Sequence, residues 1–170
     1  WKIVQERFGI DRIVEFYGAS EGNISLTNVD SKFGSIGRIP PYLKSVLPTK
    51  VVKFDVENEV VIRDENGFCI ECEDGEAGEA IGFIPDDDKF TGKFEGYTDK
   101  EATKKKILEN VFEKGDRWFS SGDLLKKDKQ GYYYFVDRIG DTFRWKSENV
   151  STNEVSEAIS AYKGIDEVNV

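Results

Sequence analysis

Two runs of strand-forming residues flank a polar turn in the second half of the chain. Residues 118–125 and 132–137 are rich in aromatic and aliphatic side chains, and the KKDKQG segment between them ends at Gly131. Such runs around a short glycine-containing segment predict a β-hairpin. This hairpin constrains the fold, because it places Asp123 and Arg138 on neighbouring strands although they are far apart in sequence.

Further alternating runs predict an antiparallel sheet. Apolar and polar residues alternate over residues 52–57 and 68–73, and the Asn66-Gly67 dipeptide between them is typical of a tight turn. Another strand is expected over residues 79–84. The apolar run 13–17 predicts a buried strand that stops at Gly18. Together these segments favour a small antiparallel sheet or a distorted barrel.

Glycine and proline interrupt the segment GSIGRIPPY, residues 34–42, and exclude a regular helix there. We expect an extended linker between subdomains at this place. Two capping boxes mark the expected helices, Thr98 with Glu101 and Ser151 with Glu154. The apolar stripes predicted to follow them are Ile107, Leu108, Val111 and Phe112 for the first helix, and Val155, Ile159 and Tyr162 for the second, which should end before Gly164.

Composition excludes several function classes. The 170 residues have a formal net charge of −9, which disfavours nonspecific binding to nucleic acid or to an anionic membrane surface. The chain has no histidine, so Ser-His or Cys-His catalysis and the common zinc sites cannot be built from it. Cys69 and Cys72 form a lone CxxC pair whose side chains should face opposite sides of an extended strand, as two free thiols.

The expected hairpin brings a carboxylate and a guanidinium together. One carboxylate accepts hydrogen bonds from both hydroxyls of a nucleotide's ribose, and a nearby guanidinium donates to the same oxygens. Asp123 and Arg138 are the natural pair for this role, and a surface ion pair is the alternative.

The segment YGASEGN, residues 17–23, offers groups that suit a nucleotide. Tyr17 has a flat face for adenine, Gly18 allows close approach, Ser20 offers a hydroxyl to a phosphate oxygen, and Glu21 offers an oxygen to Mg²⁺. The alternative is that Tyr17 caps a core.

The segment DRIGDTFRWKSENVSTNEV, residues 137–155, puts an Arg, a Gly-Asp pair and a basic-aromatic run before a helix cap. This order indicates a hinge beside a nucleotide site, and a solvated loop is the alternative.

In order and spacing, YGASEGN, GSIGRIP, FEGY, SSGDL and GYYYFVDRIGDTFRWKSENVS resemble the adenylate-forming acyl-CoA synthetases over about residues 14–160. The last motif is most similar to the fatty acid transport protein and very-long-chain acyl-CoA synthetase branch, particularly its fungal members. The resemblance implies an α/β to α+β fold. Residues 1–139 would end a large AMP-binding domain with an antiparallel distorted β-barrel, and residues 140–170 would form the hinge and the start of a small α+β C-terminal lid.

The resemblance also implies a reaction: a fatty carboxylate attacks the α-phosphate of ATP to give acyl-AMP, and the thiol of coenzyme A then displaces AMP. ATP, Mg²⁺ and coenzyme A are the implied cofactors. Tyr17 and Gly18 would flank adenine, Ser20 would contact the α-phosphate, and Glu21 would hold Mg²⁺. Asp123 and Arg138 would bind the ribose.

The same resemblance places the lid pivot at Gly140, with Asp141 beside it, and implies that Arg144 and Lys146 meet phosphates of coenzyme A or of the adenylate. Two positions depart from the family pattern. Gly140 stands where many members have Asp or Lys, and Asp141 is expected to take over the polar role. Ser147 stands where glycine is common, close to the path of the thiol.

The family's ATP loop and its adenylation lysine are expected outside Trp1–Val170, so we expect this chain to be a fragment that turns over nothing alone. The full-length protein is expected to be intracellular and membrane-associated through segments absent here, on the endoplasmic reticulum, peroxisome, lipid droplet or plasma membrane. The alternatives are an adenylate-forming ligase for a bile acid or an aromatic acid, and a non-catalytic β-rich binding module.

Overall fold

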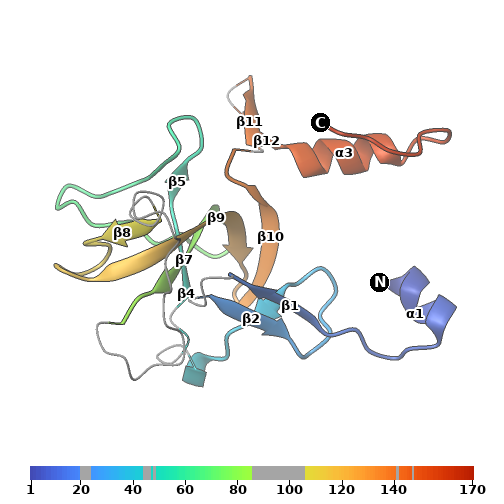
Figure 1. The fold of residues 1–170 in the computed structure, drawn as a ribbon, viewed down its shortest axis with the longest axis horizontal. Helices are drawn as coiled ribbons and strands as arrows, with labels where there is room; N and C mark the ends of the chain where they lie inside the picture. Colours follow the sequence, from blue (N-terminus) through green and yellow to red (C-terminus); the bar gives the residue numbers. More distant parts are fainter. Residues whose placement is uncertain (20–23, 44–46, 48, 86–105, 141, 147) are drawn as a thin grey trace, which may run out of the picture.

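The computed structural model describes residues 1–19, 24–43, 47, 49–85, 106–140, 142–146 and 148–170. Among these residues, six strands form one antiparallel sheet, in which the order is β3-β10-β9-β7-β4 and β8 also pairs with β9 (Figure 1). The strands are Gly37–Arg38 (β3), Thr49–Val52 (β4), Ala77–Phe83 (β7), Ile107–Glu109 (β8), Arg117–Lys127 (β9) and Tyr132–Arg138 (β10).

The described residues also form three two-stranded antiparallel sheets and two α-helices. The sheets pair β1 with β2, β5 with β6 and β11 with β12. In Figure 1, β11, β12 and α3 extend from the end of β10 away from the six-stranded sheet. The bounds are Glu15–Gly18 (β1), Ser25–Asn28 (β2), Phe54–Asp55 (β5), Val60–Val61 (β6), Thr142–Trp145 (β11), Glu148–Ser151 (β12), Lys2–Phe8 (α1), Thr152–Ser160 (α3) and a 3₁₀ turn at Pro41–Leu43 (η1).

The strand period of two divides the core into two clusters. Neighbouring residues of one strand pack on opposite sides of the sheet, as Val51 and Val52 do in β4 and Ala80 and Ile81 do in β7. The larger cluster also contains Ile24, Leu26, Ile36, Ile39, Cys72, Ile84, Phe119, Leu125 and Tyr133, and the smaller one Cys69, Val111 and Trp118. The predicted α+β architecture with a curled antiparallel sheet is confirmed.

The predicted placement of the two cysteines is confirmed. Cys69 and Cys72 are free and buried, and they belong to different core clusters. Burial raises the pKa of the Cys72 thiol to about 12, so at neutral pH this thiol stays protonated and unreactive.

The hairpin around the KKDKQG turn is confirmed, and Arg138 pairs directly with Asp123. The Asn66-Gly67 turn is present, with Gly67 at φ 85°. It does not join two long strands, however, because residues 68–73 contribute only the isolated bridges of Cys69 with Arg63 and of Glu71 with Val52. Residues 34–42 were expected to be a linker between subdomains, but part of this segment belongs to the main sheet, because Gly37–Arg38 forms its edge strand β3.

The helix expected over residues 107–112 is wrong, because Ile107–Glu109 is strand β8. The carboxylate of Asp116 accepts hydrogen bonds from the backbone N–H groups of Val111, Phe112 and Glu113, and this ties the segment into a turn. The capping box of Thr98 and Glu101 lies outside the described residues.

The second capping box is confirmed, since the Ser151 hydroxyl accepts a hydrogen bond from the Glu154 N–H at the start of α3. The stripe predicted for this helix is not buried: Ile159 is 37% exposed and Tyr162 is 72% exposed. The helix follows β12 directly, and the Ser156 hydroxyl donates a hydrogen bond to the carbonyl of Val168. Its first turn is hydrogen-bonded to Asp137 of β10, whereas Ile159 and Tyr162 lie beyond that contact. In the described part of the chain, no helix has both the length and the apolar character needed to cross a membrane.

A close backbone approach seats the β1–β2 hairpin against the main sheet. A Cβ atom added to Gly37 would lie 2.5 Å from the backbone nitrogen of Thr27 and 2.6 Å from the Cβ of Leu26. Only glycine therefore lets β3 pack this tightly on β2. Through this contact the β1–β2 hairpin is held beside β3 at the edge of the main sheet.

Gly37→Ala is therefore expected to destabilise the protein by about 1 to 3 kcal/mol, because backbone atoms must move to admit the methyl group. Chemical denaturation of the purified chain measures this. Gly18→Ala is the matched control: its new Cβ would meet nothing nearer than the Ile24 carbonyl oxygen at 3.5 Å, and its effect should stay within about 0.5 kcal/mol. Equal losses in the two variants would contradict the close-packing argument.

Candidate functional site

The site begins at an irregularity in the pairing of β7 with β9. Glu79 pairs with Leu124 and Ile81 pairs with Ser120, so the three residues 121–123 lie opposite the single residue Ala80. Such a bulge bends a strand and redirects its side chains. Gly122 has φ 79°, a value that favours glycine, and its carbonyl accepts a 2.9 Å hydrogen bond from the Ile139 N–H. Asp123 follows directly.

Tyr17, at the end of β1, contacts this carboxylate. Its hydroxyl donates a 2.6 Å hydrogen bond to Oδ2 of Asp123 across 106 residues of sequence. Burial, the hydrogen bond to Asp123 and the charge of that carboxylate raise the pKa of Tyr17, so the phenol stays a donor throughout the physiological range. The expectation that Tyr17 only offers a ring face did not include this bond, which fixes the orientation of the ring.

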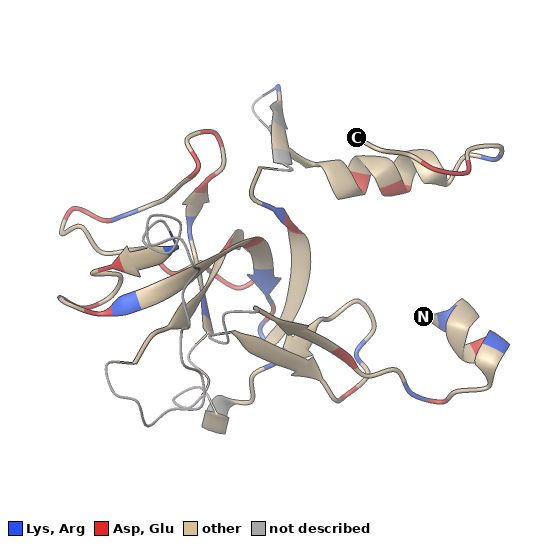
Figure 2. Cartoon of the chain, viewed as in Figure 1, with Lys and Arg blue, Asp and Glu red and all other residues tan. Residues whose placement is uncertain are grey.

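Arg138 lies on the other side of the same carboxylate. Its Nε is 3.4 Å from Oδ1 of Asp123, and the side chain of Asp123 is 13% exposed whereas that of Arg138 is 73% exposed. Figure 2 shows the acidic and basic positions that end β10, which are Asp137 and Arg138 in sequence order, where the chain leaves the sheet toward β11. The predicted Asp123–Arg138 pair is therefore formed, and its cation reaches solvent.

The carboxylate retains capacity for further donors. An ionised Asp side chain has about four lone-pair sites. Tyr17 occupies one on Oδ2 and Arg138 approaches Oδ1. Among the residues that the structure describes, these two leave an acceptor position on each oxygen, and the two positions suit a pair of vicinal hydroxyls held by one carboxylate.

The structure locates only some of the other predicted site residues. Gly18 ends β1 directly after Tyr17, and Arg144 lies within β11. Lys146 is exposed at φ 49° in the turn between β11 and β12, and Gly140 has φ 97° after β10. Ser20, Glu21, Asp141 and Ser147 lie outside the described residues. In the described part of the chain, no group of three or more Cys, Asp or Glu side chains is placed to hold a metal ion.

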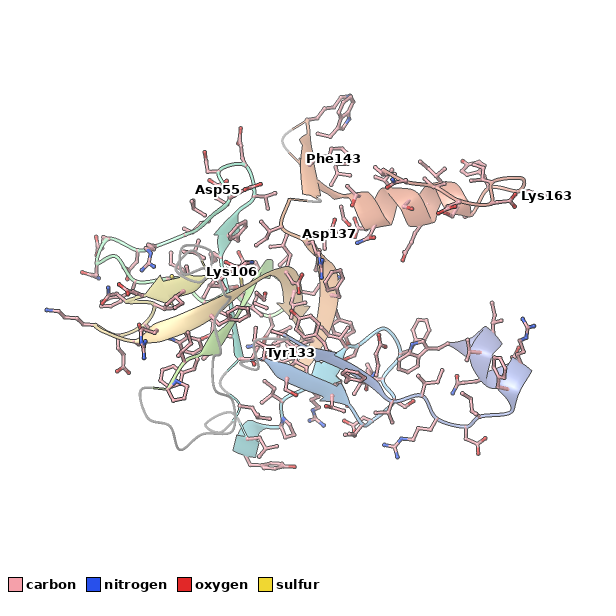
Figure 3. All side chains as sticks on the ribbon, viewed as in Figure 1. Asp55, Lys106, Tyr133, Asp137, Phe143 and Lys163 are labelled. Atoms are coloured by element: carbon pink, nitrogen blue, oxygen red, sulfur yellow. The ribbon has the colours of Figure 1, made fainter. Side chains whose placement is uncertain are left out.

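Asp137 is a structural residue at the end of β10 that nothing in the sequence singles out beyond its place in the motif. It is 0% exposed, and its carboxylate accepts hydrogen bonds from the Thr152 N–H at 3.1 Å and from Nδ2 of Asn153 at 2.9 Å. Figure 3 shows Asp137 at the upper end of β10, on the side of α3. These bonds join the end of β10 to the first turn of α3, where exposed N–H groups and the helix dipole favour an anion.

Comparison with solved structures places the fold in one class. The chain superposes on the o-succinylbenzoate coenzyme A synthetase of Bacillus subtilis in complex with AMP with a TM-score of 0.64 and 21% identity, over 99% of this chain and 30% of that one. It superposes on the anthranilate CoA ligase AuaEII in complex with anthranoyl-AMP with a TM-score of 0.63 and 20% identity, over 98% and 27% of the two chains. The fold is that of adenylate-forming CoA ligases.

Sequence comparison is more specific. The chain is 46% identical to human long-chain fatty acid transport protein 1 over 170 residues, which are 100% of this chain and 26% of that protein. It is 38% identical to the very long-chain fatty acid transport protein of Cochliobolus heterostrophus over 183 residues, which include 100% of this chain and 27% of that protein. No family model matches. The chain is similar along its whole length to fatty acid transport proteins and spans about a quarter of the length of the relatives that it matches.

Tyr17→Phe is expected to destabilise the folded chain by about 1.5 to 3 kcal/mol, because a hydrogen bond to a charged, mostly buried acceptor is lost. A pH series tests the same contact. The raised pKa of Tyr17 means that the folded state keeps its proton when the unfolded state loses it, so this contribution declines as the pH rises above about 10, the usual pKa of tyrosine.

Denaturation midpoints between pH 7 and about 10.5 measure both the stability lost in Tyr17→Phe and the fall in stability at high pH. This fall should be weaker in Tyr17→Phe than in wild type. Tyr132→Phe is the control, since the Tyr132 hydroxyl donates a 2.8 Å hydrogen bond to Asp30 at an exposed site and should contribute less than about 0.5 kcal/mol. Indistinguishable losses in the two variants would argue against a buried Tyr17–Asp123 bond.

Asp137→Ala is expected to accelerate hydrogen exchange at the Thr152 amide by about tenfold or more, because the start of α3 loses an acceptor worth roughly 1 to 3 kcal/mol. Exchange measured residue by residue tests this. Asp128→Ala removes a carboxylate that accepts from the Gln130 and Tyr132 N–H groups in the distant hairpin turn, and it should leave the Thr152 amide unchanged. Unaltered exchange in Asp137→Ala would show that the tether does not protect the helix start.

Proposed function

We propose that this chain is the ribose-binding and hinge part of an ATP-dependent fatty acyl-CoA synthetase. The observation that supports this most directly is the Asp123 carboxylate, held between Tyr17 and Arg138 with one acceptor position left on each oxygen. Similarity to long-chain and very long-chain fatty acid transport proteins along the whole chain supports the fatty-acid substrate.

The proposed reaction has two steps. A fatty carboxylate attacks the α-phosphate of ATP, which forms acyl-AMP and releases pyrophosphate, and the thiol of coenzyme A then displaces AMP. Charge develops on oxygen in both steps, so positioning and electrostatic stabilisation dominate. Structural neighbours that contain AMP, an acyl-adenylate, or ATP with magnesium support the same ligands here.

Within this scheme Asp123 accepts the ribose hydroxyls and Arg138 donates to the same oxygens. The hydroxyl of Tyr17 orients both its own ring, for contact with adenine beside Gly18, and the carboxylate. Bound Mg²⁺ would neutralise phosphate charge. Its proposed ligand is Glu21, and Ser20 is the proposed α-phosphate contact; both follow β1 in the sequence.

The segment after Arg138 is the proposed hinge. Residues 1–139 would end the large AMP-binding domain, and residues 140–170 would begin the lid that pivots at Gly140 beside Asp141. A positive φ at Gly140 suits a residue that must accept large backbone changes. Arg144 and Lys146, in β11 and its turn, are the proposed contacts for phosphates of coenzyme A or of the adenylate. Ser147, close to the proposed thiol path, would influence the second step.

The whole protein is proposed to be intracellular and associated with a membrane, where its apolar substrates partition: the endoplasmic reticulum, peroxisome, lipid droplet or plasma membrane. A bile acid or an aromatic acid is the competing substrate class for the same fold. Activity of the full-length protein toward fatty acids of graded chain length, compared with one aromatic acid, distinguishes them. Preference for the aromatic acid would overturn the fatty-acid assignment.

Asp123→Asn is expected to weaken AMP binding by the full-length protein by about 10- to 150-fold, which corresponds to roughly 1.5 to 3 kcal/mol for a lost charged acceptor. Calorimetric titration measures the change. Asp74→Asn is a matched control, because Asp74 forms an exposed contact of 3.7 Å with Lys127, and it should leave AMP affinity unchanged. AMP affinity equal to wild type in Asp123→Asn would refute the ribose assignment and favour a non-catalytic binding module.

A further inference from the structure

Glu79 is a buried carboxylate in the middle of the main sheet that the proposed reaction does not use. It lies in β7, is 2% exposed, and pairs with Val52 on one side and with Leu124 on the other. Burying a carboxylate is costly unless hydrogen bonds compensate it. Its partners therefore indicate why an acid occupies this position.

Both hydrogen-bond donors of Glu79 belong to the β9 bulge. The hydroxyl of Ser120 and the N–H of Gly122 donate to the same oxygen, Oε1, and the second of these bonds is 3.2 Å long. The Gly122 N–H faces a side chain because the bulge has removed its partner in the β-ladder. Glu79 thus supplies the acceptor that the ladder lacks at this point.

The remaining hydrogen bonds of the bulge involve Ser121, the Gly122 carbonyl and the Asp123 N–H. The Ser121 hydroxyl donates to the Ala80 carbonyl at 2.7 Å and accepts from the Asp123 N–H at 3.0 Å. The Gly122 carbonyl accepts from the Ile139 N–H. Glu79 holds the N–H of Gly122, and Asp123 is the next residue. The direction of the Asp123 side chain therefore depends on the backbone conformation of Gly122.

Lys106 contributes a positive charge near Glu79. A Cβ atom added to Gly122 would lie 2.8 Å from Nζ of Lys106, which places that ammonium against the bulge, and Figure 3 labels Lys106 beside the central strands. Burial raises the pKa of Glu79, the charge of Asp123 adds to the rise, and the bonds from Ser120 and Gly122 and the charge of Lys106 oppose it. The donors Ser120 and Gly122 and the nearby ammonium of Lys106 therefore favour a hydrogen-bond acceptor at position 79 over an apolar side chain.

We propose that Glu79 is a positioning residue for nucleotide recognition: it holds the peptide of Gly122 so that the carboxylate of Asp123 faces Tyr17, Arg138 and the ribose hydroxyls. This inference rests on the proposed function, because it assigns the ribose contact to Asp123. Glu79 itself touches no substrate. Its effect should appear as a loss of discrimination between a ribonucleotide and its deoxy analogues.

The test compares kcat/KM of the full-length protein for ATP, 2′-deoxy-ATP and 3′-deoxy-ATP at a saturating fatty acid concentration. In Glu79→Ala the preference for ATP over each deoxy analogue should fall by about fivefold or more, because a misdirected carboxylate loses the hydroxyls. Glu79→Gln keeps an acceptor oxygen for Ser120 and Gly122, and its preference should stay within about twofold of wild type.

Two further variants separate positioning from stability. Val111→Ala removes a buried side chain from the other core cluster, so it should lower stability without changing the preference for ATP. Gly122→Ala disturbs the bulge from the other side, through its φ of 79° and its closeness to Lys106, and should lower the preference as Glu79→Ala does. It also provides the test if Glu79→Ala does not fold.

Asp123→Asn decides which hypothesis fails. One outcome separates the two hypotheses: Asp123→Asn loses the preference for ATP, whereas Glu79→Ala and Gly122→Ala keep it and are slower with all three nucleotides alike. In that case the positioning role of Glu79 is wrong and the ribose assignment stands. If wild type shows a preference that Asp123→Asn retains, the ribose assignment is wrong. Loss of preference in Glu79→Ala with retention in Glu79→Gln supports the inference.

Discussion

The interruption of the β-ladder at residues 121–123 determines where the polar groups of this protein meet. β9 is the longest described strand and pairs with β7, β8 and β10, so a change in its direction affects the whole sheet. A bulge in such a strand leaves backbone groups without ladder partners, and each needs another partner when buried. Glu79, Ser121 and Ile139 provide them, and the result is an aspartate directed toward a neighbouring sheet.

The bond between Tyr17 and Asp123 then connects two sheets that share no backbone pairing. It depends on the seat of the β1–β2 hairpin, which only a glycine at position 37 allows. A bond across 106 residues has no local sequence signal, since neither periodicity nor turn chemistry specifies which tyrosine meets which carboxylate. The Asp123–Arg138 pair was predictable because a short hairpin turn fixes its register.

The same contrast explains which elements were correctly predicted. The hairpin and the Ser151 capping box follow from local chemistry, and both are present. The helix expected at residues 107–112 failed because the carboxylate of Asp116 binds successive N–H groups of that segment, and helical spacing in a short apolar run does not exclude a strand and turn. The helix α3 was predicted, but the burial expected for Ile159 and Tyr162 was wrong, because burial depends on what packs against a helix.

Asp137 bears on a conflict that the proposed glycine pivot would create. Gly140, at φ 97°, moves easily between backbone states but gives little preference for any one of them. A lid that must stop in defined positions needs its end states specified by contacts elsewhere. The bonds from Thr152 and Asn153 to the buried carboxylate of Asp137 join residues on opposite sides of Gly140 in sequence, so they stabilise this arrangement and must break if α3 moves away from β10. The freedom at the pivot and the specificity of the tether are thus separate properties, assigned to residues three positions apart in the same motif.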